Sequence, residues 1–109
     1  MDIKQKIVES NGIRFSLEEN GKEVARAYLY LLHNDLRQEP FALLEDVFVE
    51  ESLRGQGVAT KLITQIIEEA KNKGCYKIIA TSRHERFDAH ELYENLGFKN
   101  FGLEFKMYF

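Results

Sequence analysis

Val47-Phe48-Val49-Glu50-Glu51-Ser52-Leu53-Arg54-Gly55-Gln56-Gly57-Val58-Ala59 joins the most apolar run of the sequence to its clearest helical pattern. The run over residues 41–49 is typical of a central strand, although it carries two adjacent acids. Over residues 58–70, apolar side chains recur on one face at helical spacing, which predicts an amphipathic helix. The order is therefore strand, glycine-bearing turn and helix.

The downstream sequence predicts three more elements. Residues 76–82 are rich in β-branched side chains and predict a strand, and strand–helix–strand at this spacing predicts a right-handed parallel crossover. Apolar residues at helical spacing predict a second helix over residues 88–96, with Gly97 ending it. Alternating apolar and polar residues predict a last strand over residues 103–109.

The upstream sequence predicts an antiparallel meander. Apolar-rich runs over residues 3–8, 13–17 and 24–32 are separated by Asn11-Gly12 and Asn20-Gly21, pairs that supply the positive φ angles of tight hairpins. No repeat or linker interrupts the chain. The whole sequence therefore predicts one domain over residues 1–109, of the α/β (α+β) class. Its mixed sheet would have an antiparallel meander followed by β-α-β-α-β with one parallel strand pair.

Composition excludes several classes of protein. The 109 residues carry 15 Lys and Arg against 18 Asp and Glu, a net charge of −3, so no global positive field favours nucleic acid or an anionic membrane. One cysteine, Cys75, and three scattered histidines give no zinc spacing, so we expect no metal. The N-terminal residues lack the apolar block of a signal peptide, and no run is long enough to span a membrane. We expect a cytoplasmic protein.

The turn before the first helix is a candidate anion site. First-turn N–H groups of a helix have no partner inside it and lie at the positive end of its dipole, so they can bind phosphate. Gly55 and Gly57 lack the Cβ atoms that would obstruct a diphosphate, and Arg54 adds a planar cationic donor. The alternative is that the glycines only make a turn and that Arg54 is solvated.

Two motifs resemble those of one family. Arg54-x-x-Gly57-x-Ala59 is similar to the Gln/Arg-x-x-Gly-x-Gly/Ala signature of the GNAT N-acetyltransferases. Leu92-Tyr93-Glu94-Asn95-Leu96-Gly97-Phe98 is similar to the Tyr-x-x-x-Gly-Phe segment of the same family. Within the family, residues 44–47 and 74–79 look most like glucosamine-phosphate N-acetyltransferases.

The resemblance implies that acetyl-coenzyme A is the acetyl donor. Its diphosphate would lie on the glycine turn and its pantetheine arm beside the end of the preceding strand, where two parallel strands splay apart. The resemblance also implies that the N–H of Val47 polarises the acetyl carbonyl. The implied cofactor-binding residues are Val47, Phe48, Val49, Arg54, Gly55, Gln56, Gly57, Val58, Ala59 and Thr60.

Three residues are candidates for proton transfer. Glu45 aligns with the strand carboxylate that acts as the base in several branches of the family. Asp46 competes with it, because successive strand residues point to opposite faces unless a bulge intervenes. Tyr93 matches the tyrosine that protonates the coenzyme A thiolate. The alternatives are an ion-paired carboxylate with no catalytic duty and a tyrosine that only packs in the core.

The implied reaction is transfer of an acetyl group to a primary amine by direct attack in a ternary complex. We expect a small-molecule acceptor such as an amino sugar or a polyamine, with a protein amine as the next candidate. A catalytically weak module that binds acyl-coenzyme A is the alternative from another class. The family usually inserts two helices after its first strand, and Asn11-Gly12 stands in their place. The acceptor cleft would then be open, or completed by a second copy pairing through residues 103–109.

Overall fold

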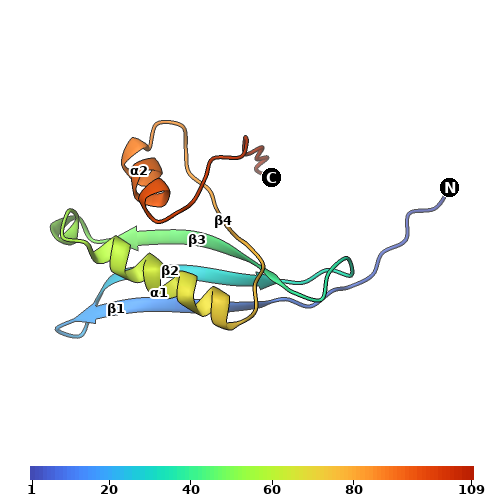
Figure 1. The fold of residues 1–109 in the computed structure, drawn as a ribbon, viewed down its shortest axis with the longest axis horizontal. Coiled ribbons are helices and arrows are strands. Elements are labelled where there is room, and N and C mark those ends of the chain that lie inside the picture. The colour runs from blue at the N-terminus through green and yellow to red at the C-terminus, as the bar shows by residue number, and fades with distance from the viewer.

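The computed structural model describes residues 1–109 as a four-stranded sheet with two α-helices (Figure 1). The elements, in chain order, are β1 (Asn11–Glu19), β2 (Lys22–Leu32), β3 (Phe41–Val49), the 3-10 helix η1 (Glu51–Leu53), α1 (Val58–Asn72), β4 (Ile78–Ala80) and α2 (Phe87–Asn95). The strand order in the sheet is β1-β2-β3-β4.

The sheet is mixed, as the sequence predicts. β1 pairs with β2 and β2 with β3 in antiparallel orientation, and β3 pairs with β4 in parallel. The crossover between the parallel strands contains α1. The predicted α+β class and the parallel strand pair are therefore confirmed, and both predicted helices form within two residues of their expected ends.

The predicted N-terminal strand is wrong. Residues 3–8 form no strand, and Asn11-Gly12 is not a turn but the beginning of β1. Gly12 lies opposite Tyr30, and a Cβ at Gly12 would come within 3.0 Å of the Tyr30 ring. The glycine thus permits close packing inside a strand, and its φ is not positive. The meander consists of β1, β2 and β3 instead, with Asn20-Gly21 as its first hairpin.

The predicted C-terminal strand also does not form. Residues 99–109 have no regular secondary structure, and Leu103, Phe105 and Met107 are exposed. A strand needs a neighbouring edge to satisfy its backbone groups, and the nearest edge, β4, has only three residues. Residues 76–77 and 81–82 likewise fall outside the shorter β4.

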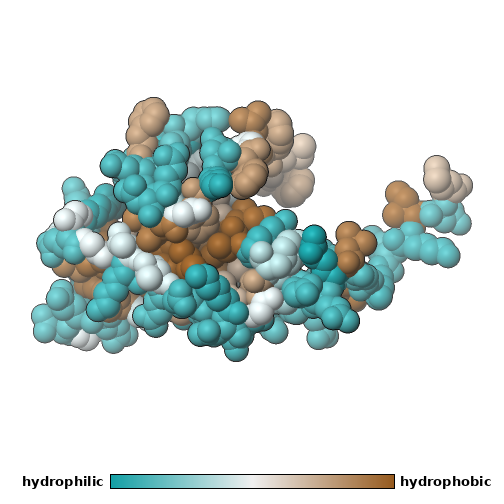
Figure 2. Space-filling view, viewed as in Figure 1, coloured by the Kyte–Doolittle hydropathy of each residue, from teal (hydrophilic) through white to brown (hydrophobic).

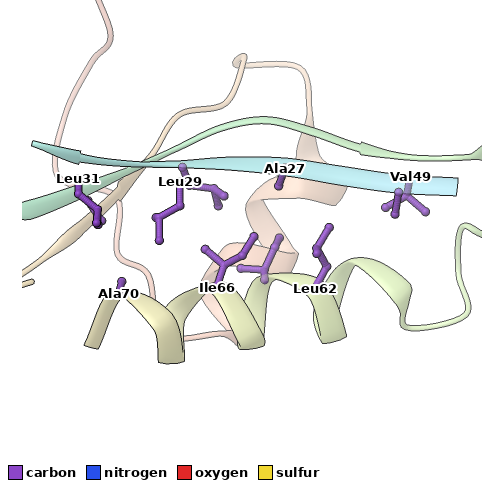
Figure 3. Packing of buried hydrophobic residues seen from close by; sticks show 11 residues of the cluster. Ala27, Leu29, Leu31, Val49, Leu62, Ile66 and Ala70 are labelled. Carbon is purple, nitrogen blue, oxygen red and sulfur yellow. The ribbon is translucent and has the colours of Figure 1, made fainter. Parts of the chain in front are cut away.

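The core lies between α1 and one face of the sheet (Figure 3). Ala25, Ala27, Leu29 and Leu31 alternate along β2 and are buried against the apolar stripe of α1, which consists of Leu62, Ile63, Ile66 and Ala70. Each fully buried large aliphatic side chain contributes roughly 1.5–3 kcal/mol to folding. This packing fixes where α1 begins relative to the end of β3. Neither helix is long and apolar enough to cross a membrane.

Candidate functional site

A β-bulge places the two adjacent acids of β3. Tyr28 pairs with Glu45 and Arg26 with Phe48, so Ala27 alone stands opposite both Asp46 and Val47. Asp46 takes the left-handed conformation, with φ of +53°, which few residues other than glycine adopt. The bulge breaks the strict alternation of the strand. As a result, both Glu45 and Asp46 line the same pocket. A regular strand would have placed only one of the two residues there.

The parallel strands separate directly after this point. The register of β3 with β4 ends at Leu44 and Ala80, so residues 45–49 of β3 have no partner from β4. Thr81 and Ser82 diverge from β3 and line the opposite wall of the pocket. The predicted splay is therefore present, and it leaves backbone groups of Val47 to Val49 without ladder partners on that side.

The start of α1 forms one end of the pocket. The first intrahelical bond from this end is donated by the Lys61 N–H to the Gly57 carbonyl, so the N–H groups of Val58, Ala59 and Thr60 have no helical partner. Gly55 and Gly57 have φ of +78° and +80°. A Cβ at either glycine would meet no atom of the chain within 4 Å, so the turn faces open space. The positive φ angles of Gly55 and Gly57, which residues with a Cβ rarely adopt, favour glycine at both positions.

Arg54 and Gln56 flank these glycines but behave differently. The Arg54 Nε donates to the Val49 carbonyl at 3.1 Å, which ties the turn to the end of β3 and leaves the two terminal nitrogens for a ligand. The Arg54 guanidinium is thus not fully solvated, and one of its three nitrogens is already engaged by the chain. The Gln56 side chain turns back and donates to the Ser52 carbonyl at 3.0 Å. Gln56 is the one predicted site residue that does not line the pocket, because this local bond captures its amide.

Tyr93 reaches the pocket from α2. Its ring packs on Phe98, with the centroids 5.3 Å apart, while the residue also lines the pocket. Burial raises the pKa of Tyr93 above its ordinary value of 10.0, with a smaller contribution from the negative charge of Glu45, and Arg86 acts in the opposite direction. The phenol therefore stays protonated at neutral pH. The packing and proton-donor roles are compatible in this position.

The pocket joins all these groups in one cavity of about 630 Å³. Figure 2 shows apolar residues gathered in the band between α1 and α2, which borders it. Every predicted site residue except Gln56 lines the cavity: Glu45, Asp46, Val47, Phe48, Val49, Arg54, Gly55, Gly57, Val58, Ala59, Thr60 and Tyr93.

The C-terminal segment adds two lining residues that the sequence did not identify. Glu104 and Lys106 form an ion pair of 3.1 Å on the pocket wall, and Lys106 together with the Thr81 hydroxyl lowers the pKa of Glu104. Their neighbours Leu103 and Phe105 are exposed. The alternation of polar and apolar residues over 103–109 could have identified Glu104 and Lys106, because it places both on the polar side of the segment even where no strand forms.

The loop between β4 and α2 supplies more charge to the wall. Arg86 pairs with Asp88 through two contacts of 3.1 and 3.3 Å, and this pairing lowers the pKa of Asp88. Here the guanidinium is partly neutralised by Asp88, while Arg83 in the same loop makes no ion pair.

Residues 2–98 match the model of the acetyltransferase (GNAT) family. Over 76 residues the chain is 37% identical to aminoglycoside N(6')-acetyltransferase type 1 of Serratia marcescens. This match covers 70% of this chain and 51% of that enzyme. Over 56 residues the chain is 41% identical to glucosamine 6-phosphate N-acetyltransferase of Trypanosoma brucei brucei. This match covers 51% of this chain and 36% of that enzyme. The matched part of the chain thus spans about half or less of the length of these relatives.

A solved structure agrees with these sequence matches. The crystal structure of glucosamine-6-phosphate N-acetyltransferase from Arabidopsis thaliana superposes with a TM-score of 0.82 at 26% identity, over 90% of this chain and 67% of that chain. The shared fold therefore includes the strands and helices that surround the pocket.

Proposed function

Because the chain belongs to the acetyltransferase (GNAT) family, we propose that it transfers an acetyl group from acetyl-coenzyme A to a primary amine. Transfer is by direct attack in a ternary complex, and residues 1–109 act as one domain. The acceptor is a small molecule of the amino sugar or polyamine class. The observation that carries this proposal is one pocket holding the free N–H groups of α1, two carboxylates and a protonated tyrosine.

The donor end of the pocket fits coenzyme A. Three free N–H groups at the start of α1, two glycines in open space and the terminal nitrogens of Arg54 form a cradle for a diphosphate. The unpaired edge of residues 47–49 can bond the amides of the pantetheine arm, and the Val47 N–H is our candidate for polarising the acetyl carbonyl. When bound, acetyl-coenzyme A supplies the thioester that is to be cleaved.

The acceptor end carries the proton acceptors. A primary amine is mostly protonated at neutral pH and must lose a proton before its lone pair can attack a carbonyl carbon. Glu45 accepts that proton, directly or through water, and Asp46 in the bulge is the competing candidate. Tyr93 donates its phenolic proton to the departing sulfur as the C–S bond breaks. The attacking nitrogen then loses its second proton, which restores the phenol through water, and an amide and a free thiol remain.

The test is a thiol-release assay on the full chain with acetyl-coenzyme A and a panel of amino sugars, polyamines, amino acids and N-terminal peptides. We expect thiol release to depend on at least one small-molecule amine. Calorimetric titration with acetyl-coenzyme A accompanies it. Binding without release for any amine would replace the enzyme with an acyl-coenzyme A sensor or assembly module, and release only with peptides would identify a protein acetyltransferase. No heat of binding would refute the proposal.

We also propose that the protein acts in the cytoplasm and as a homodimer. The support for self-association is the C-terminal segment, whose apolar side chains Phe101, Leu103, Phe105 and Met107 are all exposed. Monomers rarely leave large apolar patches uncovered. Residues 103–109 form no strand within the chain, so their backbone groups are available to pair with a second copy.

A further inference from the structure

Arg86 occupies a helix position that cations do not favour. It is the N-cap residue of α2, and its side chain makes no capping hydrogen bond. N-cap positions favour Asn, Asp, Ser and Thr, because their short side chains accept bonds from the free N–H groups of the first turn. A guanidinium has no acceptor, and here its charge lies at the positive end of the helix dipole. The stability of α2 therefore does not account for an arginine at this position.

Asp88 holds the Arg86 side chain in place. The Nε and one terminal nitrogen of Arg86 donate to the two carboxylate oxygens of Asp88 at 3.1 and 3.3 Å. The backbone is fixed as well, since the Arg86 N–H donates to the Arg83 carbonyl and the Arg86 carbonyl accepts from the His90 N–H, both at 3.1 Å. The side chains of Arg86 and Asp88 are 59% and 75% exposed, and exposed ion pairs contribute little to stability. What the pair does is fix the place of one positive charge.

Arg86 and Tyr93 lie on one face of α2. They are seven residues apart in the chain, which is close to two turns of an α-helix, and Ala89 lies between them on the same face. All three residues line the pocket. Side chains on a helix point back toward its N-terminus, so the Tyr93 phenol extends from its own turn toward the end that carries Arg86. The guanidinium and the phenol therefore approach each other along one wall of the pocket.

The charged groups around Tyr93 set how easily its phenol loses a proton. Burial raises the pKa of Tyr93, the charge of Arg86 lowers it, and the charge of Glu45 on β3 raises it. Among the cations of the pocket, Arg86 alone acts on the pKa of Tyr93. The other charged residues that line the pocket are Asp46 from β3, Arg54 before α1, Arg83, Glu85 and Asp88 around the start of α2, and Glu104 and Lys106 from the C-terminal segment.

Proton donation by Tyr93 leaves a negative charge on its oxygen. A thiol such as that of cysteine has an ordinary pKa of about 8.5 and a phenol one of about 10, so proton transfer from a phenol to a departing thiolate is unfavourable. Burial of Tyr93 makes this transfer more unfavourable, because it disfavours the phenolate. A positive charge close to the phenolate oxygen opposes that effect. The proton from the attacking nitrogen later restores the phenol.

We propose that Arg86 is a positioning residue that acts through Tyr93: its guanidinium, held by Asp88, stabilises the negative charge that forms on the Tyr93 oxygen when the phenol protonates the departing sulfur. This inference rests on the proposed function, in which Tyr93 is the acid. Asp88 also limits the effect, because its negative charge partly cancels that of Arg86. The ion pair thus sets the acid strength of Tyr93 between that of a chain without the cation and that of a chain without its counter-ion.

The first measurement is an NMR titration of ring-labelled tyrosines in the full chain without ligands, where the Tyr93 signal is the one that Tyr93→Phe lacks. We expect Arg86→Gln to raise the pKa of Tyr93, Asp88→Asn to lower it, and the double variant to lie near the wild type. Arg86→Lys keeps the charge and should keep most of its effect. Arg83→Gln is the matched control, because it removes an equal charge that lines the same pocket but does not act on Tyr93. Circular dichroism over the same pH range checks that each variant stays folded.

The second measurement is thiol release from acetyl-coenzyme A with the amine that the panel identifies. We expect Arg86→Gln to lower turnover roughly 2- to 5-fold at neutral pH and to leave coenzyme A affinity unchanged in calorimetry. The alkaline limb of the pH–rate profile should move to higher pH in Arg86→Gln and to lower pH in Asp88→Asn. In the Tyr93→Phe background there is no phenol to act on, so Arg86→Gln should cause no further loss of turnover.

Four results would overturn the role of Arg86. They are an unchanged pKa of Tyr93 in Arg86→Gln, an unchanged turnover in that variant, a turnover loss that persists in the Tyr93→Phe background, and a loss of coenzyme A affinity, which would make the guanidinium a ligand of the donor. The proposed function fails separately. If the wild type releases no thiol with any amine while Arg86→Gln still moves the titration of Tyr93, the reaction is refuted and the charge coupling stands. If the wild type releases thiol and the titration does not move, only the inference on Arg86 fails.

Discussion

At the scale of single residues, the placement of Glu45, Asp46 and Tyr93 in one pocket supports the proposed proton transfers. The left-handed φ of Asp46 is an unfavourable backbone state for a residue with a Cβ, costing about 1 kcal/mol or more. Such a state persists where the surrounding structure enforces it. Here it brings a second carboxylate to the pocket that also holds Tyr93.

Removing the phenolic proton of Tyr93 should slow the reaction. We expect Tyr93→Phe to lower turnover by roughly 10²-fold while acetyl-coenzyme A affinity and folding stability change little, because the ring keeps its packing on Phe98. Steady-state kinetics and calorimetry measure the two effects. An unchanged turnover would leave Tyr93 with a packing role only.

The pH dependence of Tyr93 gives a second readout. Its pKa is raised above 10.0, so the protonated, active form persists through the neutral range. Activity should fall only as the pH rises through this elevated pKa, and that alkaline limb should be absent in Tyr93→Phe. The same shift makes the folded state lose stability above pH 10, because ionisation is easier in the unfolded chain.

Replacing Glu45 tests the base. We expect Glu45→Gln to reduce the rate most at lower pH, where the acceptor amine is largely protonated, and progressively less as the pH approaches the pKa of a free alkylamine, about 10. Asp46→Asn, measured in parallel, is the comparison. If the Asp46 variant shows the larger pH-dependent loss, the base is Asp46.

At the scale of elements, the site depends on how β3, the glycine turn and α1 are joined. The Arg54 bond to the Val49 carbonyl holds the turn against the strand, and the core packing of Ile63 and Ile66 holds the helix against the sheet. The free N–H groups of α1 are therefore fixed relative to the splayed edge of β3. A ligand that spans both would gain from this rigidity.

A negative charge at the start of α1 should abolish donor binding. We expect Gly57→Glu to weaken acetyl-coenzyme A binding by roughly 100-fold. The new carboxylate repels the diphosphate, which then loses its hydrogen bonds to the free N–H groups of α1. The matched control is Gly74→Glu beyond the other end of α1, because both glycines have φ of +80° and open surroundings and so share the backbone strain. Equal binding in the two variants would contradict the placement of the diphosphate.

At the scale of the whole molecule, both termini lie outside the packed core. The N-terminal residues extend away from the sheet (Figure 1). The apolar side chains of the C-terminal segment are exposed. Glu104 and Lys106 nevertheless belong to the pocket wall. Association of two chains through the exposed side would therefore also fix one wall of the site.

Self-association can be tested with paired variants. We expect the wild type to sediment as a dimer at micromolar concentration and Phe105→Asp to sediment as a monomer, because a charge on the apolar side opposes burial. Leu36→Asp changes a side chain with similar exposure, 90% against 89% for Phe105, in a remote loop and should stay dimeric. A monomeric wild type would remove the dimer proposal.

The sequence by itself determined the elements whose information is local. The apolar stripe of α1, the Asn20-Gly21 hairpin, the strand over residues 41–49 and the glycine turn each carry a periodicity or a conformational requirement within a few residues. Tertiary structure decided the rest. The bulge at Asp46 depends on the register against Ala27, Gly12 serves the Tyr30 ring instead of a turn, and residues 103–109 form no strand although their alternation is regular. Pairing partners and ring contacts come from distant parts of the chain, so a local pattern states a preference that only packing can fulfil or override.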